Sequence, residues 1–227
     1  EGPEWCAVLP RVWRDRDEPA LRTLLERARA LGFTGVLIGN LGHLPLVRGL
    51  DFHLYGDYGL NVFNSRSLAY LKDKELESAC VSFELRFAQI RDLKKVLRAE
   101  AIVYGRLPLM ITENCLVQNE TGCRLDRQGL CVPEDGPCRC GQPNVLVDRT
   151  GAAFPLLPAY GHRTEIQNSK PLYLADRPEH RRLGLAYARL RFTTETAEEC
   201  VSVVQNYLDA APAAGDFTRG LYERGVE

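Results

Sequence analysis

The first 110 residues alternate short apolar runs with segments of helical spacing, and no other feature of the sequence constrains the fold as strongly. Apolar residues that recur every three or four positions predict a helix, and short apolar runs between turn residues predict buried strands. The predicted strands cover residues 5–10, 35–39, 79–85 and 101–105, and residues 51–63 are expected to hold another. The predicted helices cover residues 20–31, 67–77 and 88–99. Because strands joined by helices through short connections pair in parallel, the sequence predicts an α/β fold.

Four or five parallel strands are about half of an eight-stranded (β/α) barrel. A half-barrel would leave two long strand edges exposed to solvent, which favours aggregation. We therefore expect residues 1–110 to be the C-terminal half of a TIM-like barrel whose upstream half precedes it in the native protein, with a small open sheet as the alternative. Without that upstream half, the 227 residues are expected to fold poorly.

Residues 111–227 differ in composition and are expected to form a second region. Through residue 150 they are rich in Cys, Gly, Pro, Asn and Asp and lack periodicity, which predicts a loop. A hairpin with its turn at 148–151, a strand at 185–192 and a helix ending at Leu208 are expected to follow. The second region is therefore predicted to be a cysteine-rich loop with a small α+β extension.

Small and polar residues mark the ends of three predicted helices. Gly32 is expected to end the first, and Ser65 or Ser67 to cap the start of the next. Thr194 or Thr196 is expected to cap the last, where nearby glutamates suit the positive N-terminal end of a helix.

Five of the eight cysteines lie close together in the predicted loop. They are Cys115, Cys123, Cys131, Cys138 and Cys140. Thiols grouped in this way form disulfides or bind a metal. The chain has no apolar signal segment at its start and is typical of a cytoplasmic α/β enzyme, for which disulfides are rare. The sequence therefore predicts a metal site, whereas the remaining cysteines lie among apolar neighbours and are expected in the core: Cys6, Cys80 and Cys200.

The spacing of these thiols leaves the metal and part of the ligand set open. Iron–sulfur clusters bind thiolates, whereas zinc accepts thiolate or imidazole. Cys115 and Cys123 are the first candidate ligands, and Cys138 and Cys140 supply one ligand or two. His162 is a further candidate, because imidazole replaces thiolate in some iron–sulfur clusters. The alternatives are a structural zinc site, although the regular C-x-x-C spacing is absent, and thiols that bind nothing.

Polar residues follow several predicted strands, at the end where barrel enzymes keep their catalytic groups. They are Asn40, His43, Asp57, Asn61, Asn64, Glu84, Tyr104 and Arg106. Arg106 can bind a carboxylate or phosphate through two hydrogen bonds, and His43 can exchange protons near neutral pH. An unpaired carboxylate such as that of Glu84 is costly to bury, which favours a functional role. The candidate catalytic residues are Arg106, Glu84, Asn64, Tyr104 and His43.

Several of these residues have a structural alternative. His43 is equally compatible with a solvated loop. Asp57, Asn61 and Asn64 are typical of turns and helix caps, which the neighbouring glycines favour.

Composition and missing motifs narrow the classes of function. The formal net charge of −1 gives no overall attraction to nucleic acid or to an anionic membrane. No apolar run approaches the roughly 20 residues that a membrane-spanning helix needs. Neither Gly-x-Ser-x-Gly nor His-Glu-x-x-His is present, so the common serine-hydrolase and zinc-protease motifs are absent.

Several stretches resemble one known family. Val103-Tyr-Gly-Arg-Leu-Pro-Leu-Met, followed by Glu-Asn-Cys at Cys115 and Thr-Gly-Cys at Cys123, resembles the collagenase-like peptidases of family U32. Residues 56–65, 166–174 and 215–225 extend the resemblance in the right order over most of the chain. The resemblance implies a TIM-like barrel whose first half is absent, followed by a cysteine-bearing extension.

The same resemblance implies a function. Family members are named peptidases, yet several carry a [4Fe-4S] cluster on four cysteines and take part in oxygen-independent hydroxylation of RNA bases or of the ubiquinone ring. This chain departs from the family signature, with Tyr104 where His is usual, Pro108 where the first Cys is usual, and His162 where another Cys is usual. Cys115 falls on the second Cys of the signature.

The expected function is an iron–sulfur-dependent hydroxylase acting on an rRNA or tRNA base. The alternative is a collagenase-like peptidase acting on a peptide substrate, and a third possibility is a zinc-stapled module without catalysis.

Overall fold

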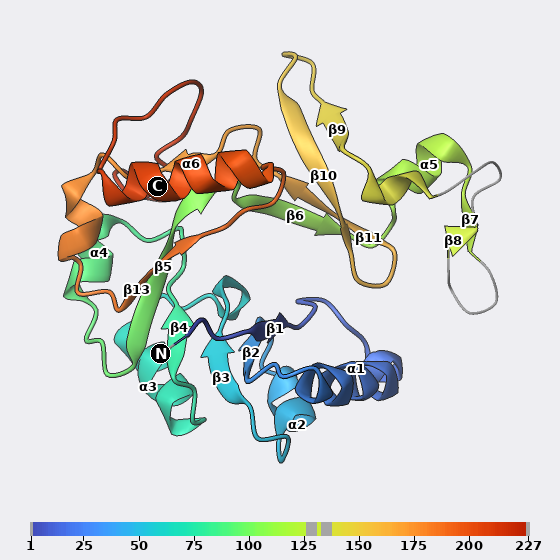
Figure 1. The fold of residues 1–227 in the computed structure, drawn as a ribbon, viewed down its shortest axis with the longest axis horizontal. Coiled ribbons are helices and arrows are strands. Elements are labelled where there is room, and N and C mark those ends of the chain that lie inside the picture. Colours follow the sequence, from blue (N-terminus) through green and yellow to red (C-terminus); the bar gives the residue numbers. More distant parts are fainter. Residues whose placement is uncertain (1, 126–130, 133–137, 226–227) are drawn as a thin grey trace. The chain divides into compact units, whose positions relative to one another are not determined.

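The computed structural model describes residues 2–125, 131–132 and 138–225 (Figure 1). Within these ranges, the side chains of Leu125, Cys131 and Val132 lie outside what is described. The chain forms two compact units and crosses between them more than once. Unit 1 comprises residues 1–103, 177–189 and 219–227, and unit 2 comprises residues 104–176 and 190–218.

Unit 1 is built on a parallel sheet, as the strand–helix alternation predicts. Its first five strands lie side by side in chain order, each parallel to the next (Figure 1). They are β1 (Cys6–Val8), β2 (Gly35–Ile38), β3 (His53–Gly56), β4 (Ser78–Cys80) and β5 (Arg98–Gly105). All five predicted strands are therefore present, although β3 occupies only four residues of the stretch 51–63 and β4 ends five residues before the expected bound.

A further strand, β13 (Tyr187–Leu190), pairs with β5. The N–H of Ala186 donates to the carbonyl of Ala99 (2.8 Å) and that of Arg191 to the carbonyl of Tyr104 (3.0 Å), so the two strands run in the same direction. The sequence predicted this strand but assigned it to the extension. On its other side, β5 also pairs with the short antiparallel strand β12 (Leu172–Tyr173), so the described sheet has seven strands, more than the four or five expected of a half-barrel.

Helix α1 (Glu18–Ala30) follows the predicted periodicity closely. Pro19 lies in its first turn, and Leu21 and Leu25, each 1% exposed, form its buried stripe. The helix ends at Gly32, whose φ of +89° is the left-handed conformation that glycine adopts without strain.

Helix α3 (Ser65–Asp73) begins at a different cap from those expected. The Oδ1 atom of Asn64 accepts hydrogen bonds from the N–H groups of Arg66 and Ser67, both at 3.0 Å. Asn64 has an extended backbone and so caps the helix, whereas Ser65 and Ser67 lie inside it.

Helix α4 (Phe87–Asp92) is shorter than predicted, because the expected helix at 88–99 stops half-way. Leu93 has an extended backbone, and Lys95 Nζ donates to the last carbonyl groups, including that of Ile90 at 2.6 Å. The residues that were expected to continue the helix instead lead into β5. The other short helices of unit 1 are η1 (Asp15–Asp17), α2 (His43–Val47), η2 (Tyr58–Leu60) and η4 (Pro178–Arg182).

The C-terminal stretch completes the core of unit 1. Tyr222 is 1% exposed, and its ring stacks on Phe87 with centroids 5.3 Å apart. Other buried apolar side chains of the sheet and helices of unit 1 include Val36, Ile38, Leu68, Ala79, Ile90 and Ile102.

Unit 2 contains a four-stranded antiparallel sheet in the order β6-β11-β10-β9 (Figure 1). Its strands are β6 (Pro108–Thr112), β9 (Asn144–Val147), β10 (Ala153–Ala159) and β11 (Arg163–Gln167). The predicted hairpin is confirmed as β9 and β10, and Asp148 Oδ1 accepts from the N–H groups of Thr150 (2.7 Å) and Ala152 (3.0 Å) in its turn.

The prediction of a plain loop at 111–150 is wrong for much of that segment. Besides the end of β6 and all of β9, it forms α5 (Leu116–Thr121), β7 (Arg124–Leu125), β8 (Cys131–Val132) and η3 (Arg139–Gly141). These elements are too short to produce a periodic pattern, which is why periodicity failed to reveal them.

The last helix, α6 (Ala197–Leu208), is capped by Thr196, which was one of the two caps expected from the sequence. Its Tyr207 joins an aromatic cluster with Tyr104 and with Tyr173 of β12 (Leu172–Tyr173). Phe192 and Phe217 complete the core of unit 2. No helix in the described ranges is long and apolar enough to cross a membrane.

Candidate functional site

Two pairs of cysteines bracket two short helices of unit 2. Cys115 is the N-cap residue of α5, and Cys123 follows Gly122, the C-cap of the same helix. Cys138 is the N-cap residue of η3, and Cys140 lies within η3. Helices α5 and η3 contact each other, so the four cysteines gather in one part of unit 2.

Cys140 lies next to Cys138 and is influenced electrostatically by Cys115 and Cys123. Its Sγ atom lies 3.0 Å from that of Cys138. The Cys138 thiol, partial burial and the charges of Cys138, Cys115 and Cys123 together raise the pKa of Cys140 to about 11. Cys115 and Cys123 are 8% and 6% exposed, whereas Cys138 and Cys140 are half-buried.

Backbone and side-chain contacts hold this region against β11. Arg163, 5% exposed, pairs with Glu113 at 2.9 Å. The N–H of Leu116 donates to Thr164 Oγ1 (3.0 Å), which fixes the residue after Cys115. Gln118 Nε2 also donates to the backbone carbonyl of Cys123 (2.6 Å). The sequence reasoning did not identify Arg163 as a support, although it lies beside the predicted ligand His162.

The donor chemistry fits a thiolate-bound metal, but the thiols do not converge on one point. In the part of the chain that the structure describes, no three His, Cys, Asp or Glu side chains are placed to hold a metal ion. None of the seven cysteines with described side chains is in a disulfide, and the side chain of Cys131 lies outside the described residues. His162 lies in the turn between β10 and β11 with a φ of +58° and joins no such group among described residues.

The second predicted site lies at the carboxyl ends of the strands of unit 1, where aromatic side chains gather. Trp13, after β1, stacks on His43, after β2, with ring centroids 5.9 Å apart. Tyr58, after β3, lies 5.9 Å from Phe83, after β4. The guanidinium of Arg11 lies over the Tyr58 ring at 5.2 Å. Sequence reasoning missed the rings because aromatic residues at strand ends have no distinctive pattern.

His43 is buried, so the alternative of a solvated loop residue is wrong. Its Nε2 lies 3.1 Å from the carbonyl oxygen of Pro10, which can only accept, so Nε2 carries the proton of the neutral ring. Burial lowers the pKa of His43, which favours that neutral form. Its Nδ1 atom has no hydrogen-bond partner among the described residues.

An ion triad links three strands of unit 1. Arg189, from β13, donates to Asp57 and to Glu100, which lie after β3 and in β5. Burial raises the pKa of Glu100, although the charge of Arg189 opposes the shift. Cys80 is fully buried nearby, and burial raises the pKa of its thiol. Arg189 was not a predicted site residue, because only the fold brings it to Asp57.

Other predicted catalytic residues have structural partners. The Asn64 side chain caps α3, which was its structural alternative. In unit 2, Tyr104 is 7% exposed and donates to Glu195 at 3.2 Å. Arg106 donates to the backbone carbonyls of Asn168 and Ser169 and so supports the chain between β11 and β12. Glu84 is half-buried, and its N–H donates to Ser82 Oγ (3.4 Å).

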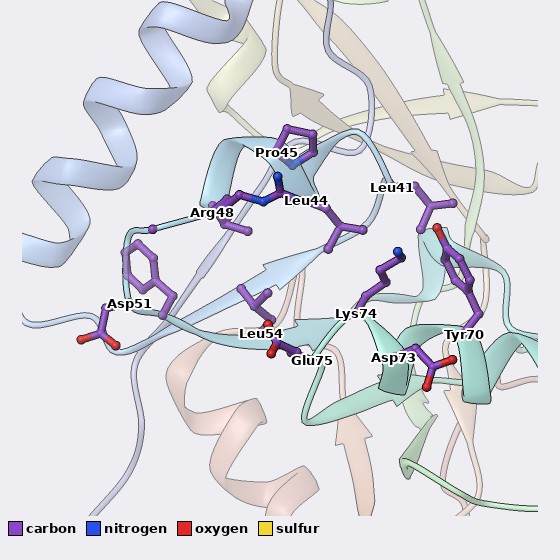
Figure 2. A pocket seen from close by; sticks show the side chains of 13 residues that line it. Leu41, Leu44, Pro45, Arg48, Asp51, Leu54, Tyr70, Asp73, Lys74 and Glu75 are labelled. Atoms are coloured by element: carbon purple, nitrogen blue, oxygen red, sulfur yellow. The ribbon is translucent and has the colours of Figure 1, made fainter.

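A pocket of about 730 Å³ lies between α2, the chain before β3 and the end of α3 (Figure 2). None of the predicted site residues lines it. Lys74 lies over the Tyr70 ring at 5.2 Å, and Asp51 pairs with Arg29 at 2.6 Å. Because its rim mixes both signs of charge, the pocket favours no class of ligand.

Comparison with known proteins identifies the family. The model of peptidase family U32 matches residues 3–145, a range that includes all four gathered thiols but not His162. No curated protein and no solved structure matches the chain. The match covers well over half of the sequence and agrees with the motifs around Gly105 and Cys115. The chain therefore belongs to peptidase family U32.

Proposed function

We propose that this protein is an iron–sulfur-dependent enzyme that hydroxylates a base of rRNA or tRNA. The observation that carries the proposal is the gathering of Cys115, Cys123, Cys138 and Cys140 around two helices in contact. The four thiols, two of them buried, lie in one part of unit 2 without converging on one point, and thiolate is the ligand type that iron–sulfur clusters use. When bound, such a cluster supplies electron transfer.

An iron–sulfur cluster suits these cysteines better than zinc does. Structural zinc sites commonly draw two ligands from each C-x-x-C or similarly tight pair. Here Cys115 and Cys123 lie at opposite ends of α5, and Cys138 and Cys140 are separated by one residue. In this proposal the four cysteines hold the cluster, and His162 is not required.

The carboxyl ends of the unit 1 strands would bind the RNA base. Tyr58 and Phe83 present half-buried rings, and a base can stack on such rings whatever its sequence context. Arg11 adds a cation beside the rings, which favours a phosphate group. The neutral ring of His43 would contribute an uncharged imidazole beneath Trp13.

The peptidase of the family name has less support among the described residues. A cysteine or serine peptidase needs its nucleophile within hydrogen-bond reach of a base. His43 contacts the carbonyl of Pro10 and the ring of Trp13, not a thiol or hydroxyl. The pKa of Cys140 is raised, whereas a nucleophilic thiol needs a lowered one.

The test is metal analysis of protein purified without oxygen, combined with nucleoside analysis of cellular RNA. Wild-type protein and a Cys200→Ser control should contain iron with matching acid-labile sulfide. Cys115→Ser and Cys123→Ser should lose both. RNA from cells that carry either variant should lack one hydroxylated nucleoside that wild-type cells contain.

Other results would redirect the assignment. Stoichiometric zinc without activity would identify a zinc-stapled module. Gelatin cleavage that survives Cys115→Ser would identify a peptidase that does not use the thiols.

A further inference from the structure

Cys138 and Cys140 form a close pair of thiols in unit 2. Their Sγ atoms are 3.0 Å apart, and a disulfide bond is about 2.05 Å long. An approach of roughly 1 Å would therefore join them. Both side chains are half-buried, so an oxidant in solution can reach them.

The local backbone leaves room for that movement. Only one residue, Arg139, separates the two cysteines, and η3 is a single turn of helix. A side chain at Gly141 would meet no atom within 4 Å outside its chain neighbours, so the last residue of η3 is not packed against another element. The nearby thiols of Cys115 and Cys123 are less accessible, at 8% and 6% exposure.

We propose that Cys138 and Cys140 form a reversible disulfide by exchange with a small disulfide of the glutathione class. The thiolate of Cys138 attacks one sulfur of oxidised glutathione and releases one glutathione thiolate. Cys140 then loses its proton and attacks the Cys138 sulfur, which releases the second glutathione. The protein loses two electrons and two protons, and oxidised glutathione becomes two reduced molecules.

In the reduced protein the Cys140 sulfur lies 3.0 Å from that of Cys138, so Cys140 is placed to resolve a mixed disulfide that forms on Cys138.

The disulfide would control metal loading. It withdraws two of the four thiols that the proposed function assigns to the cluster, and this consequence rests on that function. Oxidised protein would then take up no iron until a thiol reductant reopens the bond. The dithiol exchange itself depends only on the two sulfur atoms and not on the metal.

The test uses metal-free full-length protein equilibrated with oxidised and reduced glutathione, then alkylated and digested with trypsin. Trypsin cuts after Arg139, between the two cysteines. In oxidised wild-type protein, the two tryptic peptides should remain joined and separate on reduction. Cys140→Ser should instead accumulate a mixed disulfide with glutathione on Cys138, and a Cys200→Ser control should behave as wild type.

Two results would overturn the proposal. One is wild-type protein that keeps both thiols open to alkylation at every glutathione ratio. The other is a stable mixed disulfide on wild-type Cys138. Circular dichroism of each variant separates loss of folding from loss of exchange. If the joined peptides form but the protein binds no iron after reduction, the proposed function fails while the dithiol stands.

Discussion

The hydroxyl of Tyr222 donates a 2.6 Å hydrogen bond to the backbone carbonyl of Ile102, across 120 residues of sequence. Both groups are buried in unit 1. Tyr222→Phe removes the donor and leaves the carbonyl with one partner fewer, which should lower the free energy of unfolding by about 1–3 kcal/mol. Urea unfolding measures this change. Tyr70→Phe, at an exposed tyrosine, is the matched control and should change stability by less than about 0.5 kcal/mol.

Removing the Arg189 side chain should destabilise unit 1 more strongly than Tyr222→Phe does. Arg189→Met leaves the buried carboxylates of Asp57 and Glu100 without their cation, and breaking a buried ion pair in this way costs about 3–5 kcal/mol. Thermal or urea unfolding gives the value. The triple change to Met, Asn and Gln at these three positions should recover part of the loss. If Arg189→Met alone is neutral, the triad does not hold the strands together.

The buried Glu100 predicts a specific pH dependence. Burial raises its pKa in the folded protein, so the folded state holds this proton to a higher pH than the unfolded state does. The contribution of Glu100 to stability therefore falls as the pH rises from its ordinary value near 4.5 through the raised pKa. The difference in unfolding free energy between wild type and Glu100→Gln should change across this range and stay constant above it. A difference that is constant from pH 4 upwards would contradict the shift.

Local patterns predicted the elements of unit 1 well. The apolar spacing of Leu21 and Leu25 marks α1, and Gly32 ends it as expected. Where neighbouring residues are both good N-caps, the backbone conformation decides which of them caps the helix. Asn64 caps α3 because its backbone is extended, whereas Ser65 is already the first residue of the helix.

Long-range partners could not be predicted in this way. The strand at β13 has the right pattern, but its pairing with β5 depends on contacts between segments about 85 residues apart. The same holds for Arg189, which meets Asp57 only in the folded sheet. The cysteine cluster was predicted because Cys115 and Cys140 are close in sequence as well as in space.

A second carboxylate predicts the opposite pH dependence. Partial burial raises the pKa of Glu4, but hydrogen bonds from Tyr55, Thr34 and His53 outweigh it, and the pKa is lowered overall. This stabilisation is present above the ordinary pKa of Glu and is lost as the pH falls through the lowered value. The urea midpoint of wild type should exceed that of Glu4→Gln at pH 7, and the two should converge in acid. Midpoints that diverge as the pH falls would contradict the assignment.

The rings at the carboxyl ends of the unit 1 strands give the sharpest test of substrate class. Stacking of one base on an aromatic side chain contributes about 1–3 kcal/mol, so Tyr58→Ala should weaken binding of a short single-stranded RNA by roughly 5- to 150-fold. Arg11→Met should make the slope of log affinity against log salt less steep, by the amount expected for the loss of about one phosphate contact. Fluorescence anisotropy at fixed salt measures both, with Tyr70→Ala as the control.

The two variants separate stacking from charge, because Tyr58 and Arg11 contact each other at 5.2 Å but supply different interactions. Tyr58→Ala should reduce affinity at every salt concentration, since stacking is insensitive to ions. Arg11→Met should matter less as the salt concentration rises. Unchanged affinity in both variants, with folding intact by circular dichroism, would remove RNA from this edge of the sheet. A loss that appears with RNA but not with a peptide ligand would place the base, and not a polypeptide, on these rings.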